Sequence, residues 1–481
     1  MDTEDKASGD AGAKTSGNDV RASGNGKRET ASNRVLDPTS YRSIWQLAWP
    51  AMVSMGAHTG FAIVDMYWIG ALGTDALAAV SLIGNVIFCL FGLTQIVYVG
   101  ALAMLSRRVG AGDLNGRDGA EGVAAQALQL SFLLGIGVTI VGVAAARPSV
   151  ALFGTSETVA TLSVEYLIPM LVGFLPTFPV MALSSFFTAG GDTRTPMQVG
   201  VAASLFNAAL DPFLIFGWAG FPAWGVAGAG VASLVSSALS LAALWALYAV
   251  RGLPFPRAHP FKWLGTSAYR RLLRIGIPAS LGMLTRPAST VILLGVIARF
   301  GTAGVAAFGI TVRALSLVWL YHGALSTAVN TLTGQSLGAK NVGGIRVLVR
   351  KSIRLSLALS MLVGAGYFTW PQEIIGVFDK SDPQVLELGA IFMRLLVVAN
   401  LATSFSVIWG AVLNGAGDTQ PPMLIAVVAN WVIKLPLAYL MAVPWGMGVE
   451  GVWWAMFISL VFESGATYVW YARDRWIHAK V

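Results

Sequence analysis

Six ionisable side chains lie inside long apolar stretches of this sequence, where a charge is unexpected. They are Asp65, Asp211, Arg286, Arg394, Lys434 and Glu463. Placing a charge in a hydrocarbon environment is costly, so each such residue is by default a functional hypothesis. A low dielectric disfavours a charged carboxylate and a neighbouring cation favours it, so buried acids can exchange a proton for another cation. The acids therefore predict ion exchange of the kind that an antiporter uses.

Two further polar residues accompany the acids of the first half. Asn207 precedes Asp211 by four residues and shares its helix face, and His58 precedes Asp65 by seven residues, or about two turns. Asp65 lies about 20 residues into its predicted helix and Asp211 about 14 into its own, so both fall in the same half of the membrane. We expect the four to line one cavity. The alternative is that each Asp only caps or pins helices through hydrogen bonds.

The second half carries a different set of charges. Arg286, Lys434 and Glu463 fall within three separate apolar segments and could form one cluster. Two interpretations remain open, namely a substrate or gate site and a structural ion-pair network. Arg394 is expected to be structural, and Trp319 with His322 fits an interfacial belt better than a pathway for aromatic cations.

The elements that position these residues follow from composition. Of the 481 residues, 55% are hydrophobic and 12% are charged, whereas soluble proteins carry about 25% charged residues. Apolar segments of about 20 residues, each able to span a bilayer as a helix, recur along the chain. The predicted helices run 44–70, 77–105, 121–146, 161–187, 197–217, 225–250, 272–298, 304–332, 353–371, 385–412, 423–442 and 449–472.

The basic residues are distributed unevenly between the two sides of these helices. Eighteen Lys and Arg residues fall in or beside alternate connections and the C-terminal tail, against only Arg147, Arg299 and Lys380 on the other side. By the positive-inside rule, both termini lie in the cytoplasm of a multi-pass plasma-membrane protein. The formal charge of +8 then reflects topology, and a nucleic-acid partner is not expected.

The two halves of the sequence repeat each other. With an offset of 228 residues, the segment 41–50 matches 269–278 and Gly110-Ala111 matches Gly338-Ala339, and a Gly-Asp-Thr segment occurs at 191 and again at 417. Six helices per half give parallel repeats related by an axis along the membrane normal. The acids are not repeated, because Leu293 stands at the position of Asp65 and, when a three-residue gap is allowed, Lys434 stands at the position of Asp211.

The fold class is therefore all-α and polytopic, with twelve transmembrane helices in two pseudo-symmetric six-helix lobes. The predicted units are a disordered cytoplasmic tail (1–40), an N-lobe (41–250), a cytoplasmic linker (251–268), a C-lobe (269–472) and a cytoplasmic tail (473–481). The tail prediction rests on composition, because residues 1–40 hold too few aliphatic side chains to build a core.

Several classes of function lack their motifs. No Walker phosphate loop, H-E-x-x-H or G-x-S-x-G pattern is present, and Cys89 is the single cysteine. We expect neither enzyme activity nor a bound cofactor. A membrane enzyme or a sensor without transport stays the rival from another class.

Several short segments occur in a characteristic order along the chain. They are Val64-Asp65, Gly334-Gln335 with Gly338-Ala339, both Gly-Asp-Thr segments and Asn207-x-x-x-Asp211-Pro212. Taken together, these segments resemble the multidrug and toxic compound extrusion (MATE) family, and its DinF-like branch more than its NorM-like branch. The resemblance covers residues 41–472.

The resemblance implies an exporter of organic cations and other amphipathic small molecules, driven by inward flow of H⁺ or Na⁺. We expect the protein to be a monomer. It implies an ion site, with Na⁺ as one candidate, formed by Asp65, Asn207 and Asp211, with Ser184 and Ser233 contributed by two other helices. Ser184 replaces the usual Asn. The NorM-like branch has an acid on helix 7, and here Arg286 is present instead.

One rival stays open within transport. Related exporters that flip lipids or lipid-linked oligosaccharides share the double six-helix plan, and they tend to have a strongly basic cavity. Arg286 with Lys434 favours that alternative, and the pair of acids argues against it.

Overall fold

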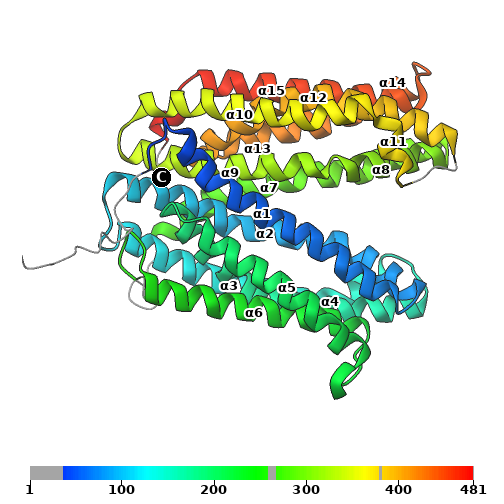
Figure 1. The fold of residues 1–481 in the computed structure, drawn as a ribbon, viewed down its shortest axis with the longest axis horizontal. Coiled ribbons are helices and arrows are strands. Elements are labelled where there is room, and N and C mark those ends of the chain that lie inside the picture. Colours follow the sequence, from blue (N-terminus) through cyan, green and yellow to red (C-terminus); the bar gives the residue numbers. More distant parts are fainter. Residues whose placement is uncertain (1–35, 258–266, 379–381, 480–481) are drawn as a thin grey trace, which may run out of the picture.

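The computed structural model describes residues 36–257, 267–378 and 382–479, and the regular elements in this part of the chain are all helices. Eleven of the described helices are long and apolar enough to cross a membrane. A further long helix, α10 (Val342–Thr369), packs along α9 and α12 and completes a set of twelve. The predicted all-α fold in two lobes is confirmed (Figure 1).

The first lobe is a bundle in which α4 is central and packs against α2, α3 and α6. Three prolines, Pro169, Pro176 and Pro179, interrupt its hydrogen-bond ladder. The helices of this lobe are α1 (Tyr41–Gly70), α2 (Thr74–Ala111), α3 (Ala120–Ala151), α4 (Glu157–Ala189), α5 (Arg194–Phe216) and α6 (Val226–Arg251), with a short 3₁₀ turn η2 (Trp218–Gly220).

The second lobe repeats this plan with more interruptions. The predicted helix 304–332 is divided at Leu315, and the predicted helix 423–442 contains a π-helical segment, η4 (Val428–Lys434). The remaining elements are α7 (Ser267–Ile297), η3 (Ala298–Phe300), α8 (Thr302–Ala314), α9 (Ser316–Gly338), α11 (Pro371–Gly376), α12 (Pro383–Gly415), α13 (Gln420–Val427), α14 (Leu435–Ala442), α15 (Gly448–Ala472) and η5 (Arg475–His478).

The start of α10 differs most from its prediction, at Val342 instead of 353. The Asn341 side chain accepts a hydrogen bond from the backbone N–H of Gly344 and so caps the helix. The first turns carry Arg346, Arg350 and Lys351 and are amphipathic, with Ile345, Leu348 and Val349 buried. Hydropathy alone detects only the more apolar later part of the helix.

The two lobes meet at a pseudo-symmetric contact between α2 and α9. A Cβ on Gly110 would come within 1.9 Å of the Gln335 carbonyl oxygen, and a Cβ on Gly338 within 2.1 Å of the Arg107 carbonyl oxygen. Gly110 and Arg107 are related to Gly338 and Gln335 by the same offset of 228 residues. The repeat axis therefore passes between these helices, and only glycine permits the close approach of their backbones.

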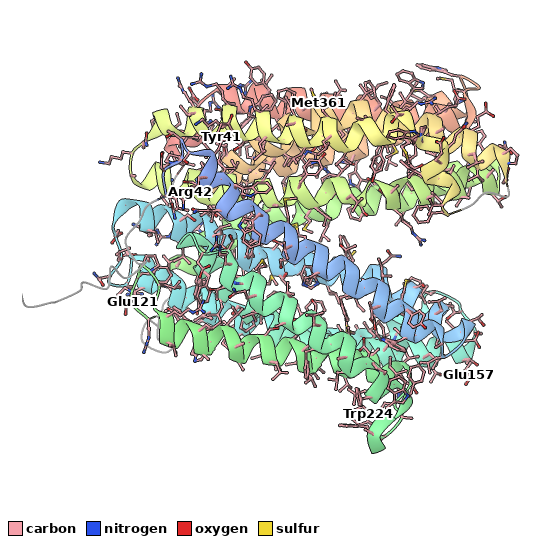
Figure 2. All side chains as sticks on the ribbon, viewed as in Figure 1. Tyr41, Arg42, Glu121, Glu157, Trp224 and Met361 are labelled. Carbon is pink, nitrogen blue, oxygen red and sulfur yellow. The ribbon has the colours of Figure 1, made fainter. Side chains whose placement is uncertain are left out.

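This contact lies at the end of the molecule where the described chain begins and ends. Near it, Leu36 donates its N–H to Gln335 Oε1 at 3.3 Å, Gln335 Nε2 donates to the Ala189 carbonyl at 2.8 Å, and Arg107 donates to the Ala479 carbonyl at 2.7 Å. Figure 2 places Arg42 and Glu121 at this end and Glu157 and Trp224 at the opposite end. Toward that opposite end the two lobes diverge (Figure 1).

Most of the predicted N-terminal tail (1–35), half of the predicted linker (258–266) and the last two residues of the predicted C-terminal tail (480–481) lie outside the described residues. Within the described part, residues 36–40 pack on the lobes. Leu36 lies next to Gly191, and Lys351 donates a hydrogen bond to the Thr39 carbonyl. Residues 36–40 thus contact both halves.

Candidate functional site

Three helices of the first lobe bring its predicted polar residues together. Asp65 lies on α1 and Asn207 with Asp211 on α5, each acid five residues before the end of its helix, and α1 packs along α5. Asn207 Nδ2 donates to Ser233 Oγ on α6 at 3.3 Å, and Asp65 and Asp211 interact electrostatically. The structure therefore joins Asp65, Asn207, Asp211 and Ser233 in one cluster.

The cluster is rich in buried acceptor oxygens that lack donors. Asp211 is fully buried, and Asn207 and Asp65 are 3% and 8% exposed. Among the described residues, both carboxylate oxygens of Asp211, Oδ1 of Asp65 and Oδ1 of Asn207 have no hydrogen-bond partner. Unpaired buried acceptors are costly, and native proteins leave few of them. Oxygens of this kind suit a proton or a hard cation such as Na⁺.

A residue that the sequence reasoning missed completes the cluster. Tyr166 on α4 is 5% exposed, and its hydroxyl donates a hydrogen bond to the Asp65 carboxylate. Tyrosine is not charged, so it did not stand out among the many aromatic residues of this chain. The signal available was its phenolic hydroxyl within the predicted helix 161–187, the helix that also contains Ser184.

Two predicted members lie elsewhere. Ser184 is 18 residues beyond Tyr166 on α4, about 27 Å along a helix, and its carbonyl accepts a hydrogen bond from Thr188. Its position does not bring it to the acids. His58 is exposed, and its ring lies 6.4 Å from that of Phe91 on α2. His58 therefore contacts α2 and is separated from the buried oxygens by about two turns.

The charges of the second lobe form a cluster from three elements. Arg286 on α7 makes an ion pair with Glu463 on α15, and the Arg286 guanidinium lies 5.0 Å from the centre of the Trp319 ring. Lys434, at the end of the π segment, interacts electrostatically with both. Arg286, Lys434 and Glu463 thus lie together, whereas Arg394 is exposed beside Phe368.

Lys434 is held by neutral groups. Its ammonium donates to Ser289 Oγ at 2.6 Å and to Asn430 Oδ1 at 2.7 Å, and the residue is only 5% exposed. Leu293, which corresponds to Asp65 in the repeat, is fully buried in an apolar core with Phe308 and Trp453. The two lobes therefore place opposite chemistry at equivalent positions.

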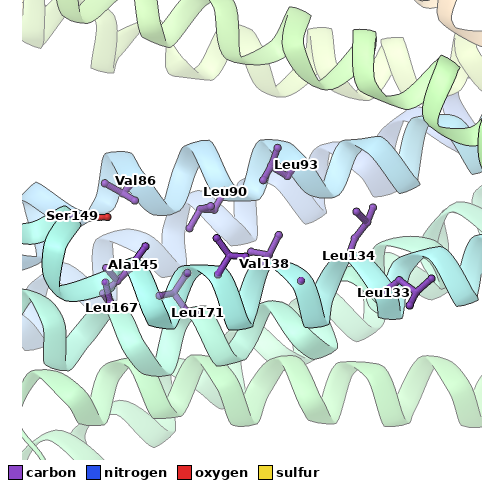
Figure 3. A pocket seen from close by; sticks show the side chains of 14 residues that line it. Val86, Leu90, Leu93, Leu133, Leu134, Val138, Ala145, Ser149, Leu167 and Leu171 are labelled. Carbon is purple, nitrogen blue, oxygen red and sulfur yellow. The ribbon is translucent and has the colours of Figure 1, made fainter.

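A groove elsewhere in the described part of the chain is apolar. It has a volume of about 470 Å³ between α2, α3 and α4 (Figure 3), and Ser149 is the single polar side chain among its lining residues. A groove of this kind offers no ligand to an ion. Among the described residues, no group of three or more His, Cys, Asp and Glu side chains is placed to hold a metal.

The repeated architecture and the first-lobe acids agree with the comparison with known families. The MatE family model matches residues 50–213 and again residues 278–440, once in each lobe and over more than half of the chain. This chain belongs to the MatE family. The double match follows the internal repeat, so each lobe is one copy of the MatE unit.

Curated relatives of this MatE protein span nearly its whole length. The probable multidrug resistance protein NorM of Thermotoga maritima is 26% identical over 447 residues, covering 91% of this chain and 94% of the relative. The FAD transporter of Shewanella oneidensis is 27% identical over 411 residues, covering 85% and 89%. These relatives are named as transporters or resistance proteins, in keeping with the absence of enzyme motifs.

Solved structures share the fold. An outward-facing multidrug resistance MATE family transporter of the MOP superfamily superposes with a TM-score of 0.84 at 25% identity, covering 93% of this chain and 98% of that one. A MOP superfamily transporter from Pyrococcus furiosus gives a TM-score of 0.85 at 24% identity, covering 94% and 99%. The multi-pass membrane fold of this MatE protein is thus established.

Proposed function

We propose that this MatE protein is a secondary active exporter that exchanges amphipathic or cationic small molecules for H⁺ or Na⁺. The exchange site is the first-lobe cluster of Asp65, Asn207 and Asp211, supported by Tyr166 and Ser233. The observation that carries the proposal is the set of four buried acceptor oxygens without donors. Their cost is offset when a cation binds and is restored when it leaves, which gives the two states that coupling requires.

The names of the relatives support the substrate class. Proteins named for multidrug resistance and for FAD transport share this fold and most of this chain's length. A single inward charge contributes about 2.3 kcal/mol per 100 mV, which sustains about a fiftyfold substrate gradient. One ion per cycle is therefore enough for useful export.

Alternating access is the mechanism that we propose for coupling. The lobes pack through backbone contacts at the end that carries both described termini, while glycines in the other half of α1, α2 and α7 (Gly56, Gly60, Gly84 and Gly295) face open space. An exchange of the closed and open ends would expose the acids to each side in turn. The ion occupancy of the buried oxygens would bias that exchange.

We also propose that the protein lies in the DinF-like branch. Helix α7 contains no Asp or Glu, and its charged residue at mid-helix is Arg286, paired to Glu463. Among the described residues, the buried acids that have an oxygen without a hydrogen-bond partner are Asp65 and Asp211, both in the first lobe. Ion coupling is then a property of that lobe alone.

The proposal is tested by dye efflux from proteoliposomes with the pH gradient and the Na⁺ gradient imposed separately. The unchanged protein should export ethidium under at least one gradient, and Asp211→Asn should lose gradient-driven export. Glu165→Gln is the matched control, because Glu165 is an exposed acid next to Tyr166 on the same helix. Equal export by the Asp211→Asn protein and the control would contradict the proposal.

A further inference from the structure

We propose that the second lobe contains a binding centre for an anionic group, carboxylate or phosphate, carried by the transported molecule. Arg286 and Lys434 would bind the anionic group. Glu463 lowers the net positive charge of the centre, and Trp319 would contact the rings of the substrate. This inference rests on the proposed function, because it names a chemical feature of the exported substrate.

The charge of the centre is not balanced. Arg286 is neutralised by its ion pair with Glu463. No carboxylate oxygen among the described residues lies within 4.0 Å of the Lys434 ammonium, whose hydrogen-bond partners are Ser289 and Asn430. Two cations and one carboxylate leave one positive charge in excess. An uncompensated charge in a membrane protein is expensive, so its presence points to a ligand of opposite sign.

The π-helical segment supports Lys434 in this role. A π turn is rare and often occurs at functional sites, and η4 ends at Lys434 after including Asn430. Asn430 Oδ1 accepts from Lys434, and Asn430 Nδ2 donates to the Ala426 carbonyl at 2.8 Å. The Lys434 ammonium has three donor hydrogens. Its hydrogen bonds to Asn430 Oδ1 and Ser289 Oγ use two of them. The lysine is therefore fixed in place without being saturated.

Arg286 makes the centre accessible. Its side chain is 29% exposed while that of Glu463 is 9% exposed, so the guanidinium extends past its partner. Trp319, 48% exposed, lies under the guanidinium. A guanidinium has five donors and can bind a second oxyanion beside Glu463. An amphipathic molecule can thus place its rings on Trp319 and its anionic group on Arg286, within the field of Lys434.

The centre complements the first lobe. Asp65 and Asp211 form a site for a cation, and the position that corresponds to Asp211 in the repeat holds Lys434. The second-lobe centre would add binding energy for a zwitterion or an anion and none for a substrate that carries only a cation, so it sets a preference among exported molecules. The substrate class that fits both lobes is an amphipathic molecule that carries an acidic group.

A pair of dyes that differ in one carboxylate tests the inference. Rhodamine B has a free carboxylate and its ethyl ester does not, and the binding of each to the purified full-length protein can be measured by fluorescence anisotropy. We define the preference as the dissociation constant of the ester divided by that of the acid. Lys434→Gln should lower this preference about tenfold, the effect of one unit charge at about 10 Å in a protein-like dielectric.

Two further variants test whether the preference follows the net charge of the centre. Lys434→Arg should keep the preference within about twofold, since it retains the charge, and Glu463→Gln should raise it several-fold, since it removes the one carboxylate of the centre. The increase in the Glu463→Gln protein tests the same claim if Lys434→Gln does not fold. A preference unchanged in both Lys434→Gln and Glu463→Gln, or in whichever of them folds, would overturn the inference.

Failure of the proposed function gives a different result. In that case neither dye moves under a pH or Na⁺ gradient in proteoliposomes, while the binding preference and its dependence on Lys434 can still be measured. If the ester is exported and the preference does not respond to Lys434 or Glu463, the exporter stands and the anion centre is refuted.

Discussion

The Tyr166 hydroxyl on α4 donates a hydrogen bond to the Asp65 carboxylate on α1, and Oδ1 of that carboxylate has no donor. One oxygen of Asp65 is therefore held in place and the other is free for a cation. The contact joins the central helix of the first lobe to the helix that also packs against the second lobe through α9. Ion occupancy at Asp65 is thus linked to the position of α1.

Replacement of Tyr166 by phenylalanine should slow export by about tenfold while substrate binding is kept. The ion-free carboxylate loses a charge-assisted hydrogen bond of about 1.5–3 kcal/mol, so the ion is released less readily. The measurement is the turnover of dye efflux in proteoliposomes at saturating gradient. Tyr67→Phe is the matched control, because Tyr67 is 71% exposed on α1. Equal turnover in the two variants would mean that Tyr166 serves packing alone.

The ion pair of Arg286 and Glu463 should contribute to the thermal stability of the protein. Arg286→Gln leaves Glu463 buried without its partner, and breaking a buried pair of this kind costs about 3 kcal/mol. Unfolding in detergent, followed by intrinsic fluorescence, should show a clear fall in the transition temperature. The double variant Arg286→Gln/Glu463→Gln should recover part of that loss. Additive losses in the double variant would show that the two side chains do not interact.

The glycine contact between the lobes should control which end of the molecule is closed. Gly110→Ala and Gly338→Ala each place a Cβ against a backbone carbonyl of the opposite lobe, at a cost of about 1–3 kcal/mol to this arrangement. The population should then shift toward the state in which this end opens and the opposite end closes.

Spin labels provide the measurement. After Cys89→Ser removes the native cysteine, labels on Trp224→Cys and Trp445→Cys report the separation of the lobes at the end opposite the termini. Both residues are exposed and lie outside the long helices. The distance distribution should move to shorter values in Gly110→Ala and stay unchanged in the control Gly366→Ala, whose Cβ would meet open space. An unchanged distribution in Gly110→Ala would remove the glycine contact from the mechanism.

The sequence predicted the helices and lobes because their signals are local and strong. Apolar runs, the offset of 228 and the clustering of basic residues each follow directly from bilayer thickness and topology. The details that differ come from features that hydropathy does not measure. Hydropathy cannot detect the cap at Asn341 or the π turn before Lys434, because neither changes the apolar character of the segment.

The site was predictable where charge is involved and not elsewhere. Asp65 and Asp211 stood out because an acid in a membrane helix is rare, and the same reasoning grouped Arg286 with Glu463. Tyr166 was missed because a tyrosine in an apolar helix looks like packing until its neighbour is known. Ser184 was included by resemblance, but the length of α4 places it at the other end of the helix from Tyr166.

The most direct test of the account is substrate-induced ion release from the purified protein. The unchanged protein is loaded with the coupling ion in detergent, ethidium is added, and released H⁺ or Na⁺ is measured with a pH indicator dye or an ion-selective electrode. The account predicts release of the ion from the unchanged protein and from Glu165→Gln, and no release from Asp65→Asn or Asp211→Asn. Undiminished release from the Asp65→Asn/Asp211→Asn double variant would contradict the assignment of ion coupling to the first lobe.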